Sequence, residues 1–170
     1  DADSADNNAT VDVDAAIASD GALTLSADTT AAGNAATVDV DGALSSNNNI
    51  LATSDDTISL DADVSVNGVS TITLTADGDN DNVGDVNIAQ AAASTVRGED
   101  GAVTLTGENV LLGSGAGTGL IQTTGAGDVI IDSISAFTMA GNESKITAWG
   151  DIDIDITAGA GTIRGRGLFA

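Results

Sequence analysis

Hydrophobic residues alternate with polar residues in short runs along almost the whole chain. A β-branched residue or leucine at every second position places the apolar side chains on one face of an extended strand and the polar ones on the other. This alternation predicts strands at 10–14, 21–25, 37–41, 57–66, 70–75, 84–88, 101–106, 127–131 and 150–156. Clusters of Gly, Asn, Asp and Ser, which are common turn residues, separate these runs. No segment has a convincing helical period, so we expect an all-β protein.

The strands recur as a degenerate repeat. In this motif a Gly or Asp-Gly is followed by two branched residues that flank one other residue. Equivalent positions of successive motifs are Ile72 and Val86, Val86 and Val103, and Val129 and Ile152. A weaker strand accompanies several copies, at 94–98, 109–113, 144–150 and 161–165. Such irregular self-similarity, with a strand pair per repeat, is typical of a β-solenoid, in which stacked coils together bury a continuous core.

At roughly 20 residues per coil, residues 1–170 predict a single parallel β-solenoid segment of about eight coils, a rod about 40 Å long. A β-sandwich also has short strands and frequent turns. Its core is about 10 Å thick, however, and aromatic residues make up only 2% of this chain. The absence of proline also fits a structure in which nearly every strand is central. The side chains expected to point inward are Val38, Val40, Ile58, Leu60, Ile72, Leu74, Val86, Ile88, Val103, Leu105, Val129, Ile131, Ile152 and Ile154.

The chain is strongly acidic, with 26 Asp and Glu against 4 Lys and Arg and a formal net charge of −22. Such a surface repels a phosphate backbone, so nucleic acid is not an expected partner. The chain has no cysteine and no histidine, which excludes disulfides, thiol catalysis and a histidine base. A hydrophobic fraction of 42% indicates a folded protein rather than an acidic disordered chain. No apolar run reaches the 18 or so residues that a membrane-spanning helix needs.

Two stretches of the repeat, residues 84–107 and 144–167, resemble the degenerate repeats of filamentous-haemagglutinin-like secreted bacterial exoproteins and adhesins. The resemblance covers the chain from about Gly21 onward. It implies a right-handed parallel β-helix that serves as an extracellular stalk on the bacterial surface, with a role in adhesion or a biofilm matrix, cell-surface glycans as partners and no catalysis. Leu168 and Phe169 do not form a polar cap, so we expect continuation into further repeats or end-to-end self-association as a filament.

A calcium loop is the sharpest local candidate for a site. Asp77, Asp79, Asp81 and Asp85 stand at positions 1, 3, 5 and 9 of a loop that carries Asn82 at the sharp turn. This is the ligand spacing of calcium loops of the EF-hand and dockerin type, and clustered carboxylates supply the hard oxygens that Ca²⁺ prefers. Ile88 replaces the acid expected at position 12. The alternative interpretation is a solvated acidic turn.

Two further patterns lie on the polar faces of the predicted strands. Aspartates alternate with apolar residues, so stacked coils bring like charges together, which either a saline medium or bound cations relieve. These pairs are Asp12 with Asp14, Asp39 with Asp41, Asp61 with Asp63, and Asp151 with Asp153 and Asp155. Hydroxyl pairs flank leucines, at Thr24 with Ser26, Thr73 with Thr75, and Thr104 with Thr106. Such an array is what an ice-binding solenoid presents, although threonine is also a common strand residue.

An enzyme that binds or cleaves polysaccharides is a further alternative, since some β-helices act this way with paired carboxylates. The four basic residues (Arg97, Lys145, Arg164 and Arg166) are scattered, however, and Trp149 is the only tryptophan. We expect Trp149 to fill a corner or a coil end. The sequence therefore favours a structural rod over an enzyme.

Overall fold

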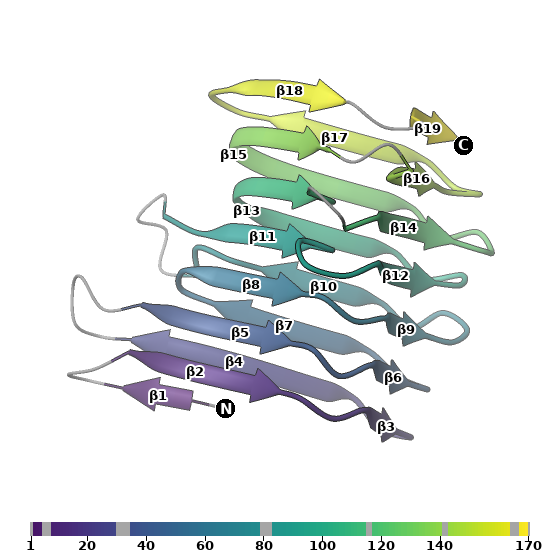
Figure 1. The fold of residues 1–170 in the computed structure, drawn as a ribbon. Helices are drawn as coiled ribbons and strands as arrows, with labels where there is room; N and C mark the ends of the chain where they lie inside the picture. Colours follow the sequence, from purple (N-terminus) through teal and green to yellow (C-terminus); the bar gives the residue numbers. More distant parts are fainter. Residues whose placement is uncertain are drawn as a thin grey trace.

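The computed structural model describes residues 2–4, 8–29, 35–78, 83–114, 117–140, 143–163 and 167–169. These residues form strands, turns and bends, and none of their segments is a helix long and apolar enough to cross a membrane. Every strand pair is parallel, so the chain winds upward in coils from its N-terminus to its C-terminus (Figure 1). The front strands run from left to right while the chain rises, and the rear strands return from right to left (Figure 1). The fold is therefore a right-handed parallel β-solenoid, as the sequence predicts.

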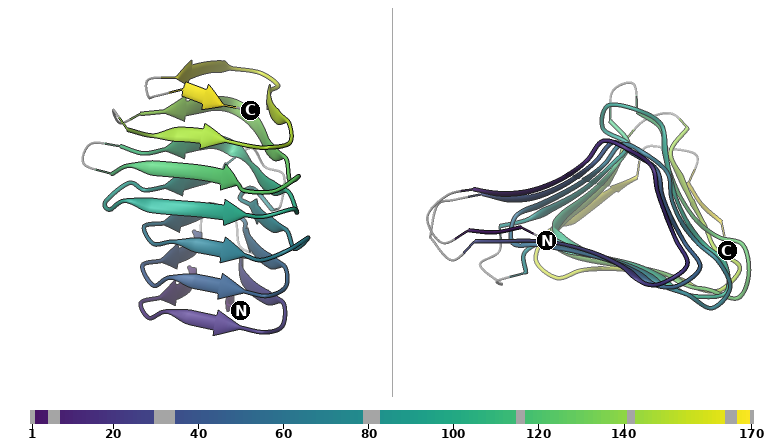
Figure 2. Two further views of the ribbon diagram at one scale, coloured as in Figure 1. Left: turned by 90° about the vertical axis from the view of Figure 1, so that its right-hand side faces the viewer. Right: turned by 90° about the horizontal axis from the view of Figure 1, so that it is seen from below.

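The solenoid has three faces, and its cross-section is triangular (Figure 2). The first face contains β2 (Ala9–Val13), β5 (Ala36–Val40), β8 (Thr57–Leu60), β11 (Asp85–Ile88), the second halves of β13 (Val103–Leu112) and β15 (Val129–Met139), and β18 (Ala160–Ile163). The second face contains β3 (Ile17–Ser19), β6 (Leu44–Ser46), β9 (Val64–Val66), β12 (Ser94–Gly98), β14 (Gly119–Thr123), β16 (Lys145–Thr147) and β19 (Gly167–Phe169). The third face contains β1 (Ala2–Ser4), β4 (Leu23–Thr29), β7 (Ile50–Ser54), β10 (Ile72–Thr75), the first halves of β13 and β15, and β17 (Ile152–Ile156).

The corner between the third and first faces is built in two ways. In the lower coils, and again between β17 and β18 at the top, a turn or loop separates two strands, whereas β13 and β15 continue around the corner as single strands. Their pairing shifts in register between Gly107 and Asn109, which is where the chain bends. At the corner between the second and third faces, Gly101 packs so closely that a Cβ there would collide with the carbonyl oxygen of Ser70. Glycine at this position lets one coil rest directly on the next.

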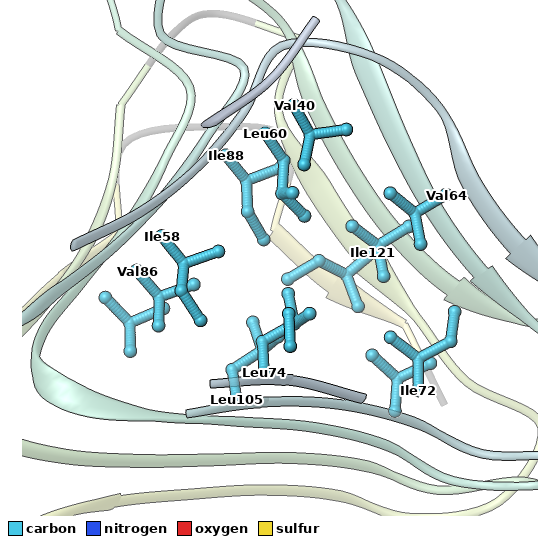
Figure 3. Packing of buried hydrophobic residues seen from close by; sticks show 14 of the residues in the cluster. Val40, Ile58, Leu60, Val64, Ile72, Leu74, Val86, Ile88, Leu105 and Ile121 are labelled. Carbon is cyan, nitrogen blue, oxygen red and sulfur yellow. The ribbon is translucent and has the colours of Figure 1, made fainter. Parts of the chain in front are cut away.

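The core is a set of inward-facing columns that the parallel register keeps aligned from coil to coil. Ile58, for example, pairs with Val38 below it and with Val86 above it, and all three side chains are fully buried. Figure 3 shows these aliphatic side chains converging from the three faces on the centre of the coil. Twelve of the fourteen side chains that the alternation assigns to the interior are buried, and the exceptions are Ile152 and Ile154 in β17. Both are half-buried and pack against the core.

The number of coils is slightly lower than the sequence predicts. The sheet of the second face is 7-stranded, with one strand from each coil, whereas about eight coils were expected. Along this face the step between register partners is shortest from Leu44 to Val64 and longest from Val64 to Val96. The longer steps arise because the corners have unequal lengths, which the alternation within strands does not reveal.

Candidate functional surfaces

The structure places only part of the predicted calcium loop. Asp79 and Asp81 lie outside the described residues. Asp77 is buried and has a positive φ of 66°, and the loop returns so close to it that a Cβ on Gly84 would collide with the Asp77 backbone nitrogen. The Asp85 carboxylate accepts a hydrogen bond of 2.8 Å from the Asn109 side-chain amide. Within the described residues, no three potential metal ligands lie close enough together to hold an ion.

Aspartates do face one another across neighbouring coils, as the alternation predicts, but only at some positions. Asp12 pairs in register with Asp39, and Asp132 pairs with Asp155. The Asp39 column then continues with Ser59, which interrupts the row of charges.

Two carboxyl groups are held at raised pKa values. Partial burial raises the pKa of Asp39, and the charges of Asp41 and Asp12 raise it further, against a hydrogen bond from Ser59 that lowers it. Partial burial, followed by a hydrogen bond with Asp28, raises the pKa of Asp55. A raised pKa in the folded state means that folding favours the protonated acid, so ionisation of these groups at neutral pH opposes folding.

A third group of aspartates has a structural role that the sequence does not reveal. Their carboxylates accept hydrogen bonds from backbone N–H groups of the coil above. These N–H groups lie at or beside a corner, where the pairing of strands does not provide each of them with a carbonyl partner. These bonds join Ala91 to Asp61 (2.9 Å), Thr95 to Asp63 (2.8 Å), Ala126 to Asp100 (3.0 Å) and Asp151 to Asp128 (2.8 Å). Asparagine does the same at two corners, where Thr71 donates to Asn49 over 2.9 Å and Ala35 donates to Asn8 over 3.0 Å. Some of the acidic residues are therefore part of the contact between coils.

This role predicts different effects for two substitutions of Asp128. Asp128→Ala removes the acceptor of the Asp151 N–H, so we expect the free energy of unfolding to fall by about 1 to 2 kcal/mol. Asp128→Asn keeps an acceptor oxygen and removes one of the many negative charges, so we expect it to stay within about 0.5 kcal/mol of the unsubstituted protein. Denaturant unfolding followed by circular dichroism measures both. Equal losses in the two variants would contradict the role as acceptor.

One cavity among the described residues is small and polar. It has a volume of about 250 Å³ and is lined by Ala18, Ser19, Asp20, Ser45, Ser46, Asn47 and Asn67. Its polar side chains form a short chain of hydrogen bonds. The Asn67 amide donates to the Asn47 side-chain oxygen over 2.8 Å, and the Asn47 amide donates to the Asp20 carboxylate over 2.9 Å. No basic or aromatic side chain lines this cavity, so it lacks the groups with which a sugar-cleaving site would stack and bind its substrate.

Trp149 lies at a corner, which is one of the two places expected from the sequence, but it does not fill that corner. It lies at the corner between β16 and β17, and 80% of its surface is exposed. Among the side chains that the structure describes, Phe137 in the second half of β15 is an aromatic residue of the core, and the alternation does not assign it to the interior.

The threonine pairs are on the outer side of the third face, as predicted. Thr73 and Thr104 are register partners, and so are Thr75 and Thr106, while the leucines between them are buried. The Thr53 hydroxyl donates to the Ser26 hydroxyl of the coil below over 3.2 Å.

The core is open at both ends of the described stack. Val11 and Ile17 in the lowest coil are half-exposed, although their register partners Val38 and Leu44 are buried. At the other end Ile154 is half-exposed, although its partner Ile131 is buried. The same inward column therefore changes from buried to half-buried where the described coils end.

The comparisons with known proteins add no family. No protein-family model matches the chain, and neither a curated protein nor a solved structure matches it. What is established is the class of fold: a parallel β-solenoid built from degenerate repeats.

Proposed function

We propose that this chain is a structural segment of an extracellular rod, in which a further coil or a second copy covers each open end. The observation that carries the proposal is the half-exposure of Val11, Ile17 and Ile154 in columns that are otherwise buried. Burying apolar surface stabilises by about 25 cal/mol per Å². Covering these side chains therefore favours growth along the axis.

The two ends of the described stack are complementary. Because all strands are parallel, the free edges of β1, β2 and β3 in one copy run in the same direction as β17, β18 and β19, on the same three faces, in another. Free parallel edges also carry backbone donors and acceptors that a further strand pairs with. Such a contact joins two different surfaces, and it repeats without closing, so it generates a filament rather than a dimer.

The adhesin role rests on the sequence repeats, which resemble those of filamentous-haemagglutinin-like exoproteins, together with a fold compatible with that resemblance. An extracellular, cell-surface location and binding to cell-surface glycans belong to the same proposal. The proposal assigns no catalytic role, and the described cavity contains one carboxylate, Asp20, beside hydroxyl and amide groups. Binding of the soluble chain to immobilised cell-surface glycans tests the adhesive part separately from the rod.

The test of the rod uses the 170-residue chain with one substitution at an open end. We expect elongated oligomers that grow with protein concentration and with sodium chloride, because salt screens the repulsion between copies of charge −22. Ile154→Lys places a charge on the open core and should abolish this growth. Asp153→Lys, on the outer side of the same strand, should not.

Sedimentation velocity and electron microscopy measure both variants. A monomer at every concentration and salt level, or equal loss of assembly in the two variants, would contradict end-to-end stacking.

A further inference from the structure

The third face carries a flat, uncharged array of hydroxyl and methyl groups, which we call the threonine plane. It consists of two outward columns on β4, β7, β10 and the first half of β13. One column is Thr24, Leu51, Thr73 and Thr104, and the other is Ser26, Thr53, Thr75 and Thr106. Each of these side chains is at least partly exposed, and the four strands keep one register throughout. Seen along the axis, the lower side of the triangular cross-section is nearly straight (Figure 2).

The uncharged region has sharp borders. At the corner end of the plane lie Asp28 and Asp55, which follow the Ser26 and Thr53 positions on β4 and β7. In the coils above, the column of Thr106 continues with Asp132 and then Asp155. None of the eight residues of the threonine plane carries a charge, although the protein has a net charge of −22. Acidic residues occupy the neighbouring positions directly beyond the plane.

The geometry of the plane is rigid and periodic in two directions. Neighbouring strands lie about 4.8 Å apart, and successive outward residues on one strand lie about 6.6 Å apart. Threonine has a restricted χ1 angle, so its methyl and hydroxyl groups hold fixed positions above a paired sheet. Ordering such a surface on binding costs little side-chain entropy. A ligand that matches it is itself neutral, rigid and periodic.

We propose that the threonine plane binds ice, a neutral lattice of water molecules. Regularly spaced hydroxyl groups donate to and accept from lattice water, and the methyl groups between them exclude disordered water. Charged side chains would hold their own hydration shells against the lattice, because removing a charge from water is costly. The uncharged plane lacks that obstacle, and Leu51, which is 38% exposed, adds a further apolar contact.

Other occupants fit the plane less well. Its area is roughly 200 to 250 Å² from the spacings above, whereas a stable protein interface buries about 800 Å² per partner. A second copy lying side by side would therefore be held weakly. A polysaccharide sheet would stack its sugar rings on aromatic side chains, and none belongs to the plane. This function goes beyond the rod and does not depend on it.

The experiment measures thermal hysteresis and the shape of ice crystals grown in solutions of the 170-residue chain. We expect a gap between the melting and freezing temperatures and faceted crystals. The double variant Thr75→Lys with Thr106→Lys should lose both, because it places two charged side chains on the plane. Thr37→Lys with Thr57→Lys is the matched control, since these threonines are outward and half-buried on the first face. It should retain both.

A second pair of variants keeps the test decisive if the double variant does not fold. Leu51→Lys changes a plane residue that is already exposed, and Leu111→Lys changes an outward leucine on the first face. Circular dichroism first verifies that each is folded. Loss of hysteresis in the plane variants alone supports the proposal. Absence of hysteresis and crystal shaping with the unsubstituted chain, or equal loss in the first-face controls, overturns it.

Discussion

Leu74→Ala is expected to lower the free energy of unfolding by about 2 to 5 kcal/mol. Leu74 lies at the centre of an inward column, between Ala52 below and Leu105 above, and only 1% of it is exposed. Strand β10 pairs with a neighbour on each side, so the backbone around the site is fixed by two ladders. The surroundings therefore relax little into the space that the substitution leaves.

The control for this prediction is Thr73→Ala on the same strand, one residue away on the outer side. It removes no buried group, so the expected loss is within about 0.5 kcal/mol. In a solenoid each coil contacts only its neighbours, so unfolding in stages is expected when one coil is weakened. Denaturant unfolding combined with hydrogen exchange distinguishes a local loss around β10 from a global one. Equal losses for the two variants would mean that β10 does not have the assigned orientation.

The alternation predicts the core well because a strand has a period of two and the solenoid buries only one of its faces. Twelve of the fourteen assigned inward residues are buried for this reason. Ile152 and Ile154 have the same local pattern, yet they are half-exposed, since burial also requires a covering coil. The alternation contains no information about that coil.

The corners were harder to predict than the strands. Which turn lies above which depends on the length of each coil, and that length varies from step to step. The bond from Ala91 to Asp61 joins residues 30 positions apart, and the bond from Asp151 to Asp128 joins residues 23 apart. No local motif links such pairs. The predominance of Asp over Glu is the one signal that a short acidic side chain is needed.

The acidic residues have two opposite effects on the stability of this protein. Short acids at the corners accept backbone hydrogen bonds, which stabilises the stack. Further acids lie on the strands of the same small rod: partial burial raises the pKa of Asp39 in β5, and the charges of Asp41 and Asp12 raise it further. The chain has few basic groups to offset these charges, and the one ion pair among the described residues joins Arg97 to Glu99 over 3.5 Å. Dissolved cations are therefore expected to matter for stability.

Calcium is expected to stabilise the fold at the loop that begins at Asp77. A cation that binds only the folded state adds RT ln(1 + [L]/Kd), about 2.7 kcal/mol when the free metal is a hundred times Kd. Gly84 packs against the backbone of Asp77, so the two described ends of this segment lie close together. A chelator should then lower the melting temperature measured by circular dichroism. Asp79→Ala with Asp81→Ala should remove most of that difference.

Two controls separate a calcium site from general screening of charge. Asp153→Ala with Asp155→Ala removes the same charge from exposed positions on β17, and it should leave the calcium effect intact. Sodium chloride screens exposed charges without specific ligands, so at matched ionic strength it should stabilise less than calcium. If sodium restores stability as fully as calcium, or if the β17 pair abolishes the calcium effect equally, the assignment of Asp77, Asp79, Asp81 and Asp85 as ligands is wrong. Cations would then act on the acidic surface as a whole, through the repulsion that the stacked aspartates create.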